Sequence, residues 1–353
     1  MYFLLVIPPL FYLNIGMFPN VGTYFSILGV CLAGLYRSAF HFGIDKKKII
    51  LILNITFFIF YLGFNNSLIN SQKIGFIAGS FWWIFLLFVI LFFRVPSFDR
   101  LMKISHGVSI VSILVLSLDA VYRLIFNVVQ RDDIGRYAFK RGLIDIDSNF
   151  AGIYALLIFF MSFYCIRYSR KFIKYLPVLY VLILATLSIA AIAVTSIFMV
   201  FFLTPKKLKI FLMFFLFLSL PVLFNYLLDI MANSPSGLTK IQFMQEAVHL
   251  FINRDVFDVL FGTGVSSVKL NGFDPHLLIL QLILEFGMIG FTLYFSIQVA
   301  LISLFSKAYV YIFLPFFMVS FSVASISNPI FSVVILIFYY FSYYENGQRE
   351  MSN

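Results

Sequence analysis

The sequence predicts an all-α fold, a polytopic integral membrane bundle of about twelve transmembrane helices. Three observations predict it. Of the 353 residues, 62% are hydrophobic and only 11% are charged, whereas soluble domains carry roughly 25% charged residues. The mean hydropathy is +1.01. Apolar runs long enough to cross a bilayer as a helix, which takes roughly 20 residues, recur along the whole chain.

These runs define the predicted spans. The spans cover residues 2–18, 21–40, 49–64, 75–93, 107–126, 150–166, 176–203 (two crossings), 210–228, 287–305, 310–325 and 330–344. The first run has neither a basic start nor a small-residue cleavage site, so we expect a retained span and not a removed signal peptide. Residues 1–353 are expected to form a single membrane domain.

The run over residues 176–203 is long for one span and short for two. Basic clusters precede it at residues 167–174 and follow it at residues 206–209. If both clusters are cytoplasmic, the run crosses twice as a hairpin. Ser188, Thr195 and Ser196 are then available to satisfy backbone groups at its tip, which must be buried in protein. We expect two crossings, which leaves both termini cytoplasmic.

The net charge of +10 does not indicate a nucleic-acid partner. The cations lie in short clusters between apolar runs, as in the cytoplasmic loops of membrane proteins. Cys31 and Cys165 both lie in apolar runs and show no disulfide or metal-site spacing. We therefore expect no metal and no cofactor.

Two longer loops are predicted on the outer side, over residues 127–149 and 229–286, the second with amphipathic helices. The first contains Arg131, Arg136 and Arg141, and the second contains Lys240 and Arg254. A charged loop is often only a solvated connector. Here the cations run against the positive-inside trend, and Arg suits bidentate phosphate contact. The two loops are therefore expected to converge on an anion such as a diphosphate.

Asp119 and Arg123 stand four residues apart near the outer end of a predicted span, so they can pair on one helix face. Ionisable residues within spans usually face the bundle interior. A buried structural pair and a role in a substrate cavity both remain open.

His276 is the main candidate for proton transfer. Pro275 suits the first position of a helix and Asp274 suits its cap, so His276 falls on the first turn. Imidazole can take and return a proton near neutral pH. Glu285 ends the same helical run, either as a second acid/base group or as a structural partner for a cation.

The same stretch of the chain contains two closely spaced pairs of glycines. Gly262 and Gly264 could cradle a phosphate through their backbone N–H groups. No strand and helix flank them as in a dinucleotide fold, so a dinucleotide site is not expected. Gly287 and Gly290 form a small-x-x-small step that lets helices approach closely.

Taken together, these motifs resemble the O-antigen polymerase and O-antigen ligase superfamily. That superfamily shows a Gly-x-Gly, then a His, then a helix of nine or ten residues and a Gly-x-x-Gly that opens a span. Here FGTGVSS is followed by His276, and nine residues separate Leu277 from Gly287. Arg141-Gly142 and Asp147-Ser148-Asn149 also resemble the family's entry to an earlier span.

The chain departs from the family pattern at three points. Leu277 stands where the family often has a polar residue. The run over residues 187–197 lacks the family's Arg, and Lys240 stands where an Arg is usual.

The resemblance implies a glycosyltransferase of lipopolysaccharide biosynthesis at the periplasmic face of the bacterial inner membrane. A polymerase joins oligosaccharide repeat units carried on undecaprenyl diphosphate, by metal-independent transfer with inversion. It implies that Arg131, Arg136, Arg141, Lys240 and Arg254 contact the diphosphate or sugar, and that a chain-length regulator protein is a possible partner. It also implies roles for two further residues, Asp147 and Asn149, in holding the loop or the acceptor sugar. The alternatives are an O-antigen ligase, which transfers glycan to lipid A core, and a lipid-linked oligosaccharide flippase.

Overall fold

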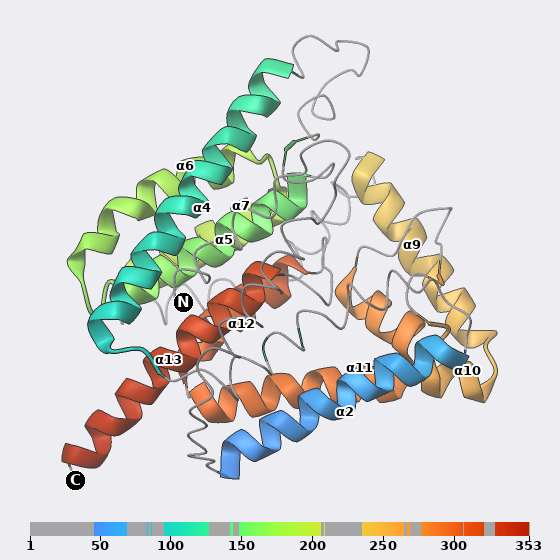
Figure 1. Cartoon of the computed structure of the whole chain (residues 1–353). Helices are drawn as coiled ribbons and strands as arrows, with labels where there is room; N and C mark the ends of the chain where they lie inside the picture. Colours follow the sequence, from blue (N-terminus) through green and yellow to red (C-terminus); the bar gives the residue numbers. More distant parts are fainter. Residues whose placement is uncertain are drawn as a thin grey trace.

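The computed structural model describes residues 46–68, 83, 86, 95–126, 142–143, 148–205, 208, 235–264, 267–268, 277–305, 307–320 and 329–352 (Figure 1). All regular elements within these ranges are helices, which confirms the all-α prediction for them. Two helical stretches, Phe98–Ile125 and Leu278–Phe305, are long and apolar enough to cross a membrane by length and composition. The predicted spans 2–18, 21–40 and 210–228, and nearly all of 75–93, lie outside the described residues.

One group of helices surrounds α5. The group comprises α4 (Phe98–Phe126), α5 (Ser148–Cys165), α6 (Tyr175–Ala185), α7 (Ile189–Leu203), α12 (Lys307–Val319) and α13 (Pro329–Ser352). Helix α5 contacts all the others, and every side chain over residues 151–162 is buried. A helix that is apolar all round needs such an enclosed position. The Oγ atoms of Ser109 in α4 and Ser162 in α5 lie 3.1 Å apart. His106, in the first part of α4, lies 3.2 Å from the hydroxyl of Tyr175, which follows the end of α5. The two helices are therefore antiparallel, and α5 begins where α4 ends.

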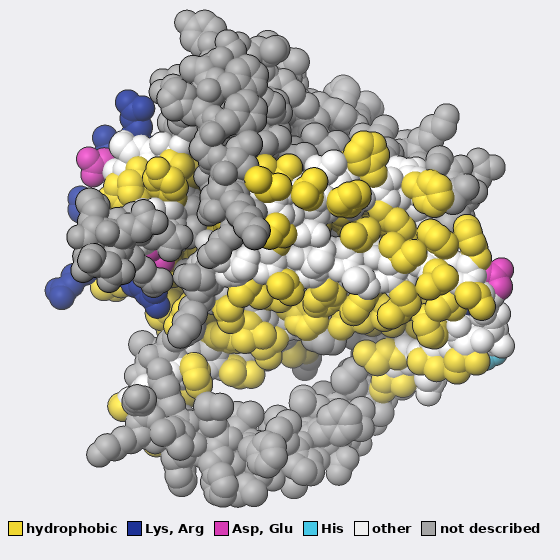
Figure 2. All heavy atoms as spheres, turned by 90° about the horizontal axis from the view of Figure 1, so that it is seen from below, with side chains coloured by type: hydrophobic (Ala, Val, Ile, Leu, Met, Phe, Trp, Pro, Cys, Tyr) yellow, Lys and Arg dark blue, Asp and Glu magenta, His cyan; other side chains and the backbone are white. Residues whose placement is uncertain are grey.

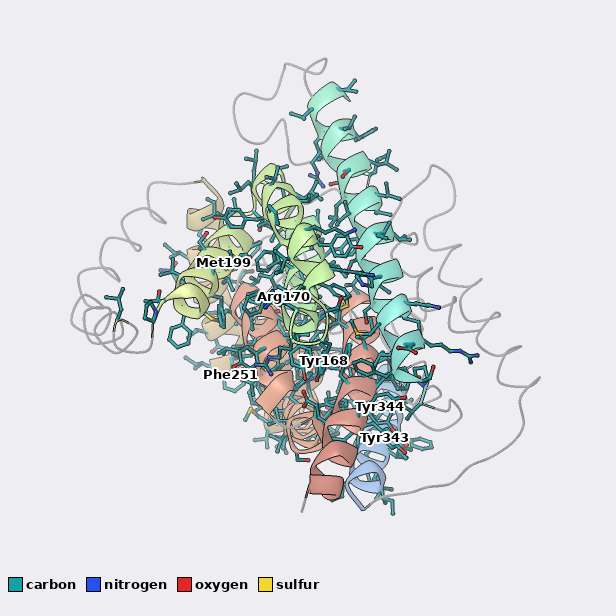
Figure 3. All side chains as sticks on the ribbon, turned by 90° about the vertical axis from the view of Figure 1, so that its left-hand side faces the viewer. Tyr168, Arg170, Met199, Phe251, Tyr343 and Tyr344 are labelled. Carbon is teal, nitrogen blue, oxygen red and sulfur yellow. The ribbon has the colours of Figure 1, made fainter. Side chains whose placement is uncertain are left out.

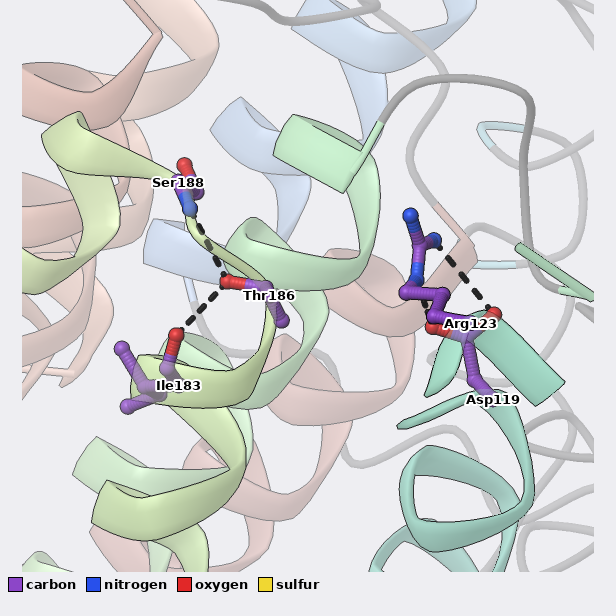
Figure 4. A network of polar contacts seen from close by, with 5 residues as sticks. All are labelled: Asp119, Arg123, Ile183, Thr186 and Ser188. Carbon is purple, nitrogen blue, oxygen red and sulfur yellow. Dashed lines mark hydrogen bonds and ion pairs between the residues drawn. The ribbon is translucent and has the colours of Figure 1, made fainter. Parts of the chain in front are cut away.

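Helices α6 and α7 form the hairpin predicted for residues 176–203. The hydroxyls of Tyr180 and Ser196 lie 3.0 Å apart and hold the two arms side by side. At the tip, Thr186 Oγ1 donates to Ile183 O (2.7 Å) and accepts from Ser188 N (3.3 Å) (Figure 4). These bonds satisfy backbone groups at the turn.

Only one of the three residues predicted for this tip lies there. Ser188 caps α7, because its hydroxyl accepts from Ala191 N at 3.5 Å. Ser196 holds the arms together instead, and Thr195 is buried within α7. Thr186 was not predicted, although a Thr just after an apolar run is a common way to close a turn.

A second group surrounds α11 (Figure 1). It comprises α2 (Lys46–Leu68), α9 (Pro235–Ile252), α10 (Val256–Phe261) and α11 (Leu278–Phe305), and α11 contacts the other three. Helix α2 buries Leu51, Ile55, Phe58 and Leu62, which recur every three or four residues. Its outward face exposes large apolar side chains at the same spacing, namely Ile49, Leu53, Phe57, Phe60 and Phe64. Exposed apolar stripes of this kind mark contact with another apolar surface or with lipid.

Two contacts fix the direction of α11. The Arg167 guanidinium lies 5.3 Å from the ring centre of Tyr311, near the start of α12. The Leu278 N–H donates to Ser320 O, just beyond the end of α12 (3.2 Å). Helix α11 therefore begins at the same end of the bundle as α5. We call this the glycine end, because Gly142 and Gly152 lie there beside the end of α4 and the start of α5.

The opposite end, where α4 begins, is the cationic end. Its exposed basic side chains are Arg100, Lys103, Arg167, Arg170, Lys171 and Lys174, the last three in the short 3-10 helix η4 (Arg170–Lys174). Tyr164 and Tyr168 both donate to Glu345 Oε1 at 2.5 Å, which ties the C-terminal end of α5 to α13. Figure 3 labels Tyr168 and, on α13, Tyr343 and Tyr344. Burial and the bond to Glu345 raise the pKa of Tyr168, so it remains a donor at neutral pH.

The surface between the two ends is largely apolar. Figure 2 shows hydrophobic side chains across the middle of the face formed by α2 and α11. Lys and Arg gather at one edge of that face, with acidic side chains among them, and an acidic side chain and a His appear at the other edge.

Candidate functional site

A break in α11 defines the candidate site. Gly287 has φ 63° and ψ −175°, which divides the helix into a first arm over residues 278–286 and a second arm over residues 288–305 (Figure 1). A left-handed φ is accessible to glycine without the penalty that a Cβ adds. The break leaves the last carbonyls of the first arm without partners in their own helix, so other groups must satisfy them.

The loop after α10 supplies the first of these partners. Thr263 N donates to Leu284 O (3.2 Å), and Gly264 N donates to Glu285 O (2.9 Å). The Arg254 guanidinium adds a bond from Nη1 to Leu284 O at 2.6 Å. The loop and Arg254 therefore act together as the cap of the first arm.

Helix α2 supplies the partner of Phe286 O, the last carbonyl of the first arm. The Tyr61 hydroxyl lies within hydrogen-bond reach of Phe286 O and of Phe261 O, the latter at 2.8 Å. Asn65 is fully buried and its Nδ2 also donates to Phe261 O. Tyr61 and Asn65 thus join the end of α10 to the end of the first arm of α11.

Sequence reasoning missed Tyr61 and Asn65. A signal was present, since Asn54, Tyr61 and Asn65 follow a seven- and four-residue spacing that puts them on one face of an apolar helix. Polar residues on one face of a span usually face another helix. Asn54 fits that pattern too, because its Oδ1 accepts from Ser296 of α11 at 3.0 Å.

Two glycines make the closest backbone contact of the site. A Cβ on Gly262 would lie 2.3 Å from Glu285 O and 2.6 Å from Gly287 N. A Cβ on Gly287 would lie 2.4 Å from Leu260 O and 2.5 Å from Gly262 N. Gly262 also has a positive φ of 74°. Both positions therefore require glycine for conformation and for space.

The predicted phosphate cradle is not formed by the backbone amides of Gly262 and Gly264. Gly262 N donates to Asp258 O (2.8 Å) and Gly264 N donates to Glu285 O. Both N–H groups are thus used inside the protein. Gly262 permits close packing against α11, and Gly264 donates its amide to the end of the first arm. A Gly-x-Gly pattern alone does not distinguish these roles from anion binding.

Arg254 has two structural bonds. Besides Leu284 O, its Nη2 donates to Thr263 Oγ1 at 3.3 Å. Thr263 Oγ1 also accepts from Ser267 Oγ at 2.8 Å. Burial lowers the pKa of Arg254, and the neighbouring Asp258 carboxylate opposes that shift. An arginine stays protonated under such a shift, so a fixed positive charge lies at the break.

Glu285 is buried at the end of the first arm, with 1% of its surface exposed. Its Oε2 accepts from Gln281 Nε2 at 3.1 Å. The first arm begins at Leu278, and the preceding Leu277 is buried but not helical. The helix therefore starts three residues after Pro275, whereas the sequence predicted it to start at Pro275 with His276 on its first turn. Glu285 lies about two turns along the arm.

Gly142, the second residue of the Arg141-Gly142 motif, lies against the buried ion pair of α4. Arg123 Nε lies 2.6 Å from Asp119 Oδ2, both side chains are 2% exposed, and Nη2 lies 3.4 Å from Oδ1 (Figure 4). A Cβ on Gly142 would lie 2.1 Å from Arg123 Nη2 and 2.3 Å from Asp119 Oδ1. The backbone at Gly142 therefore covers the pair directly, which favours the structural interpretation of Asp119 and Arg123.

Asn149 lies beside the tip of the α6–α7 hairpin. Its Oδ1 accepts from Ser188 Oγ at 2.9 Å. Close by, a Cβ on Gly152 would lie 2.6 Å from Ser188 Cβ and 3.0 Å from Ala191 Cβ. The start of α5 is thus fastened to the hairpin tip, and Asn149 makes one of the bonds that do so.

The other predicted site residues are not described. Arg131, Arg136, Arg141, Asp147 and His276 lie outside the described residues, and Lys240 belongs to α9 with its side chain outside them. Within the described ranges, no group of three or more His, Cys, Asp or Glu is arranged to hold a metal ion.

Comparison with protein-family models, with curated proteins and with solved structures finds no match to this chain. A function is therefore inferred from the site described above and from the sequence motifs that form it.

Proposed function

We propose that the chain is a multi-span protein of the bacterial inner membrane that polymerises oligosaccharide repeat units carried on undecaprenyl diphosphate. The cationic end then faces the cytoplasm, because Lys and Arg concentrate in cytoplasmic loops. The glycine end faces the periplasm, and both termini are cytoplasmic. The exposed apolar stripe of α2 supports lipid contact between these two ends.

One observation carries the proposal. The two sequence motifs on which the resemblance rests, LFGTG and Glu285-Phe-Gly-x-x-Gly290, form one structural unit through the Gly262–Gly287 contact. Gly290 also lies against Tyr61 of α2, where a Cβ would be 2.8 Å from Cε1. A rigid joint at the end of the arm that begins at Leu278, two residues after His276 in the sequence, would help to fix the position of that imidazole.

The proposed reaction is an inverting glycosyl transfer. A hydroxyl oxygen of the new repeat unit attacks the anomeric carbon of the growing glycan, and the bond from that carbon to the diphosphate oxygen breaks. If His276 is the base, it takes the hydroxyl proton. If His276 instead binds the diphosphate, solvent takes that proton. Arg136, Arg141 and Lys240 would stabilise the leaving diphosphate, an effect often worth several kcal/mol.

Arg254 has a different role in this scheme from the one that the sequence predicted. Two of its guanidinium nitrogens bond to Leu284 O and Thr263 Oγ1. We therefore assign it to holding the joint, with its charge acting on the diphosphate at longer range. Asn149 likewise holds the hairpin tip through Ser188.

A lipid-linked oligosaccharide transporter is the second candidate, because of the broken helix. Transporters often bind substrates and ions at the ends of discontinuous helices. At this break the carbonyls of Leu284, Glu285 and Phe286 already accept bonds from within the protein. Because these carbonyls are already bonded within the protein, the break is better suited to a fixed scaffold than to a site that binds a transported substrate.

The lipopolysaccharide profile of a deletion strain separates the three functions. A polymerase deletion leaves core carrying a single repeat unit, and the wild-type gene restores the ladder. A ligase deletion leaves bare core and accumulates lipid-linked polymer. Bare core without accumulated polymer indicates a transporter and contradicts the proposal.

A further inference from the structure

Helix α9 has three different faces. Phe243 and Ala247 are buried against Leu284 and Val268. A second face is polar and exposed, with Gln242, Gln245 and His249. A third face is apolar and exposed. Its side chains are Met244, Val248 and Ile252, between 43% and 73% exposed. Their spacing of four residues puts them on one side of the helix.

Helix α10, which follows α9 after residues 253–255, also exposes apolar side chains. None of its residues is buried. Val256, Phe257 and Leu260 are between 41% and 76% exposed. With Met244, Val248 and Ile252 they form an apolar surface free of charged side chains, which we call the α9–α10 surface. Exposure of so many large apolar groups to water is unfavourable.

The α9–α10 surface joins the exposed stripe of α2. The rings of Phe257 and Phe261 lie 4.7 Å apart, and Phe261 lies 6.1 Å from Phe64 of α2. Phe64 is the last member of the exposed stripe that includes Phe57 and Phe60. Ring contacts therefore connect the exposed apolar side chains of α10 to the stripe of α2.

Polar groups border this surface on the other side. Asp255 caps α10 through Asp258 N (2.7 Å), and Asn253 Nδ2 donates to His249 O (2.8 Å). A helix pair with one exposed apolar face and one exposed polar face suits the boundary between bilayer and water.

We propose that the α9–α10 surface is inserted into the hydrocarbon of the periplasmic leaflet, beside the lipid-facing stripe of α2. The occupant is membrane lipid, because the surface continues a stripe that the chain already turns outward along a span. This inference rests on the proposed membrane orientation but not on the proposed glycosyl transfer. Lipid contact would hold the α10–α11 joint at a fixed depth, level with the diphosphate of a lipid-linked substrate.

Fluorescence quenching in proteoliposomes tests the insertion. The parent carries Cys31→Ser and keeps the fully buried Cys165, after a check that it does not label. Val248→Cys and Val256→Cys report on the surface and are labelled with an environment-sensitive dye. Gln245→Cys and Asn253→Cys are the matched controls on the polar side. We expect spin-labelled lipid to quench the first pair at least about twofold more than the second, with iodide showing the reverse order.

The other outcomes overturn the inference. Strong iodide quenching at positions 248 and 256 without lipid quenching means that water covers the surface. Exclusion of both quenchers there means that another part of the chain or a second copy covers it. Phe57→Cys provides the lipid-facing reference. The readout does not depend on polymerisation, so loss of the proposed activity and loss of this pattern are separate results.

Discussion

Gly262 and Gly287 pack backbone to backbone, so that a Cβ on either residue would lie within 2.6 Å of the other's amide nitrogen. Gly262 follows α10 and Gly287 breaks α11, and each has a positive φ. Through this contact the two sequence motifs form one structural joint. Helix α11 can therefore change direction without leaving its carbonyls unsatisfied.

The first prediction concerns this contact. Gly262→Ala and Gly287→Ala each force alanine into a positive-φ conformation that is essentially restricted to glycine, at about 1–3 kcal/mol. Each also introduces a steric overlap that typically costs about 1–3 kcal/mol. We expect each variant to lower the unfolding temperature of the detergent-solubilised protein markedly. Met288→Ala is the control, because Met288 is exposed and adjacent. Alanine variants at the glycines that melt like the control would contradict the contact.

Arg254 provides the second prediction. Arg254→Lys keeps the charge but loses the two-pronged contact with Leu284 O and Thr263 Oγ1. We expect a loss of about 1–3 kcal/mol of stability, because a buried carbonyl loses a charged donor. Thr263→Val should give a smaller loss in the same direction. If Arg254 instead binds diphosphate, the Lys variant should raise KM with little change in stability.

The third prediction concerns the pair Asp119–Arg123. Removing one partner of a buried ion pair typically costs about 3–5 kcal/mol, whereas replacing both with apolar residues is often neutral. We therefore expect Asp119→Leu to abolish the folded protein and the double variant Asp119→Leu/Arg123→Met to recover it. A double variant that folds but produces no polymer would instead indicate that Asp119 and Arg123 act in the substrate cavity.

Gly142→Ala gives the fourth prediction, since its Cβ would overlap Arg123 Nη2 and Asp119 Oδ1. The overlap should destabilise the wild-type background by about 1–3 kcal/mol. It should cost less in the Asp119→Leu/Arg123→Met background, because the fixed guanidinium is gone. Equal losses in the two backgrounds, measured as unfolding midpoints, would show that Gly142 does not act through the pair.

The fifth prediction separates two roles of Asn149. If Asn149 holds the hairpin tip through Ser188, then Asn149→Ala should lower stability by about 1 kcal/mol. Ser188→Ala should cost more, because it also removes the cap of α7. Their effects should then be less than additive in the double variant. Loss of polymer in Asn149→Ala at unchanged stability would instead indicate contact with the acceptor sugar.

Local features of this fold could be predicted from the sequence. The length of the apolar runs predicted helices over residues 49–64, 107–126 and 150–166. The structure extends each of these helices at one or both ends. The basic clusters on both sides of residues 176–203 were sufficient to predict a hairpin. The break at Gly287 coincides with the boundary between a helical run ending at Glu285 and the next predicted span.

Long-range contacts of the site could not be predicted. A backbone carbonyl such as Leu284 O has no side-chain signature, so nothing in the sequence shows that Arg254 and Thr263 bond to it. A glycine that permits close packing and a glycine that frees an amide for phosphate look the same in a pattern. Only the fold shows that Gly262 is of the first kind and that the Gly264 amide bonds to Glu285 O.

Chain elongation by purified protein tests the central proposal most directly. Protein in proteoliposomes would receive undecaprenyl-diphosphate-linked repeat units, and the products would be resolved by gel. We predict a ladder from wild type and none from His276→Ala, with the unfolding temperature of the variant unchanged. A ladder from His276→Ala would contradict the role of His276, and its absence with wild type would contradict the polymerase.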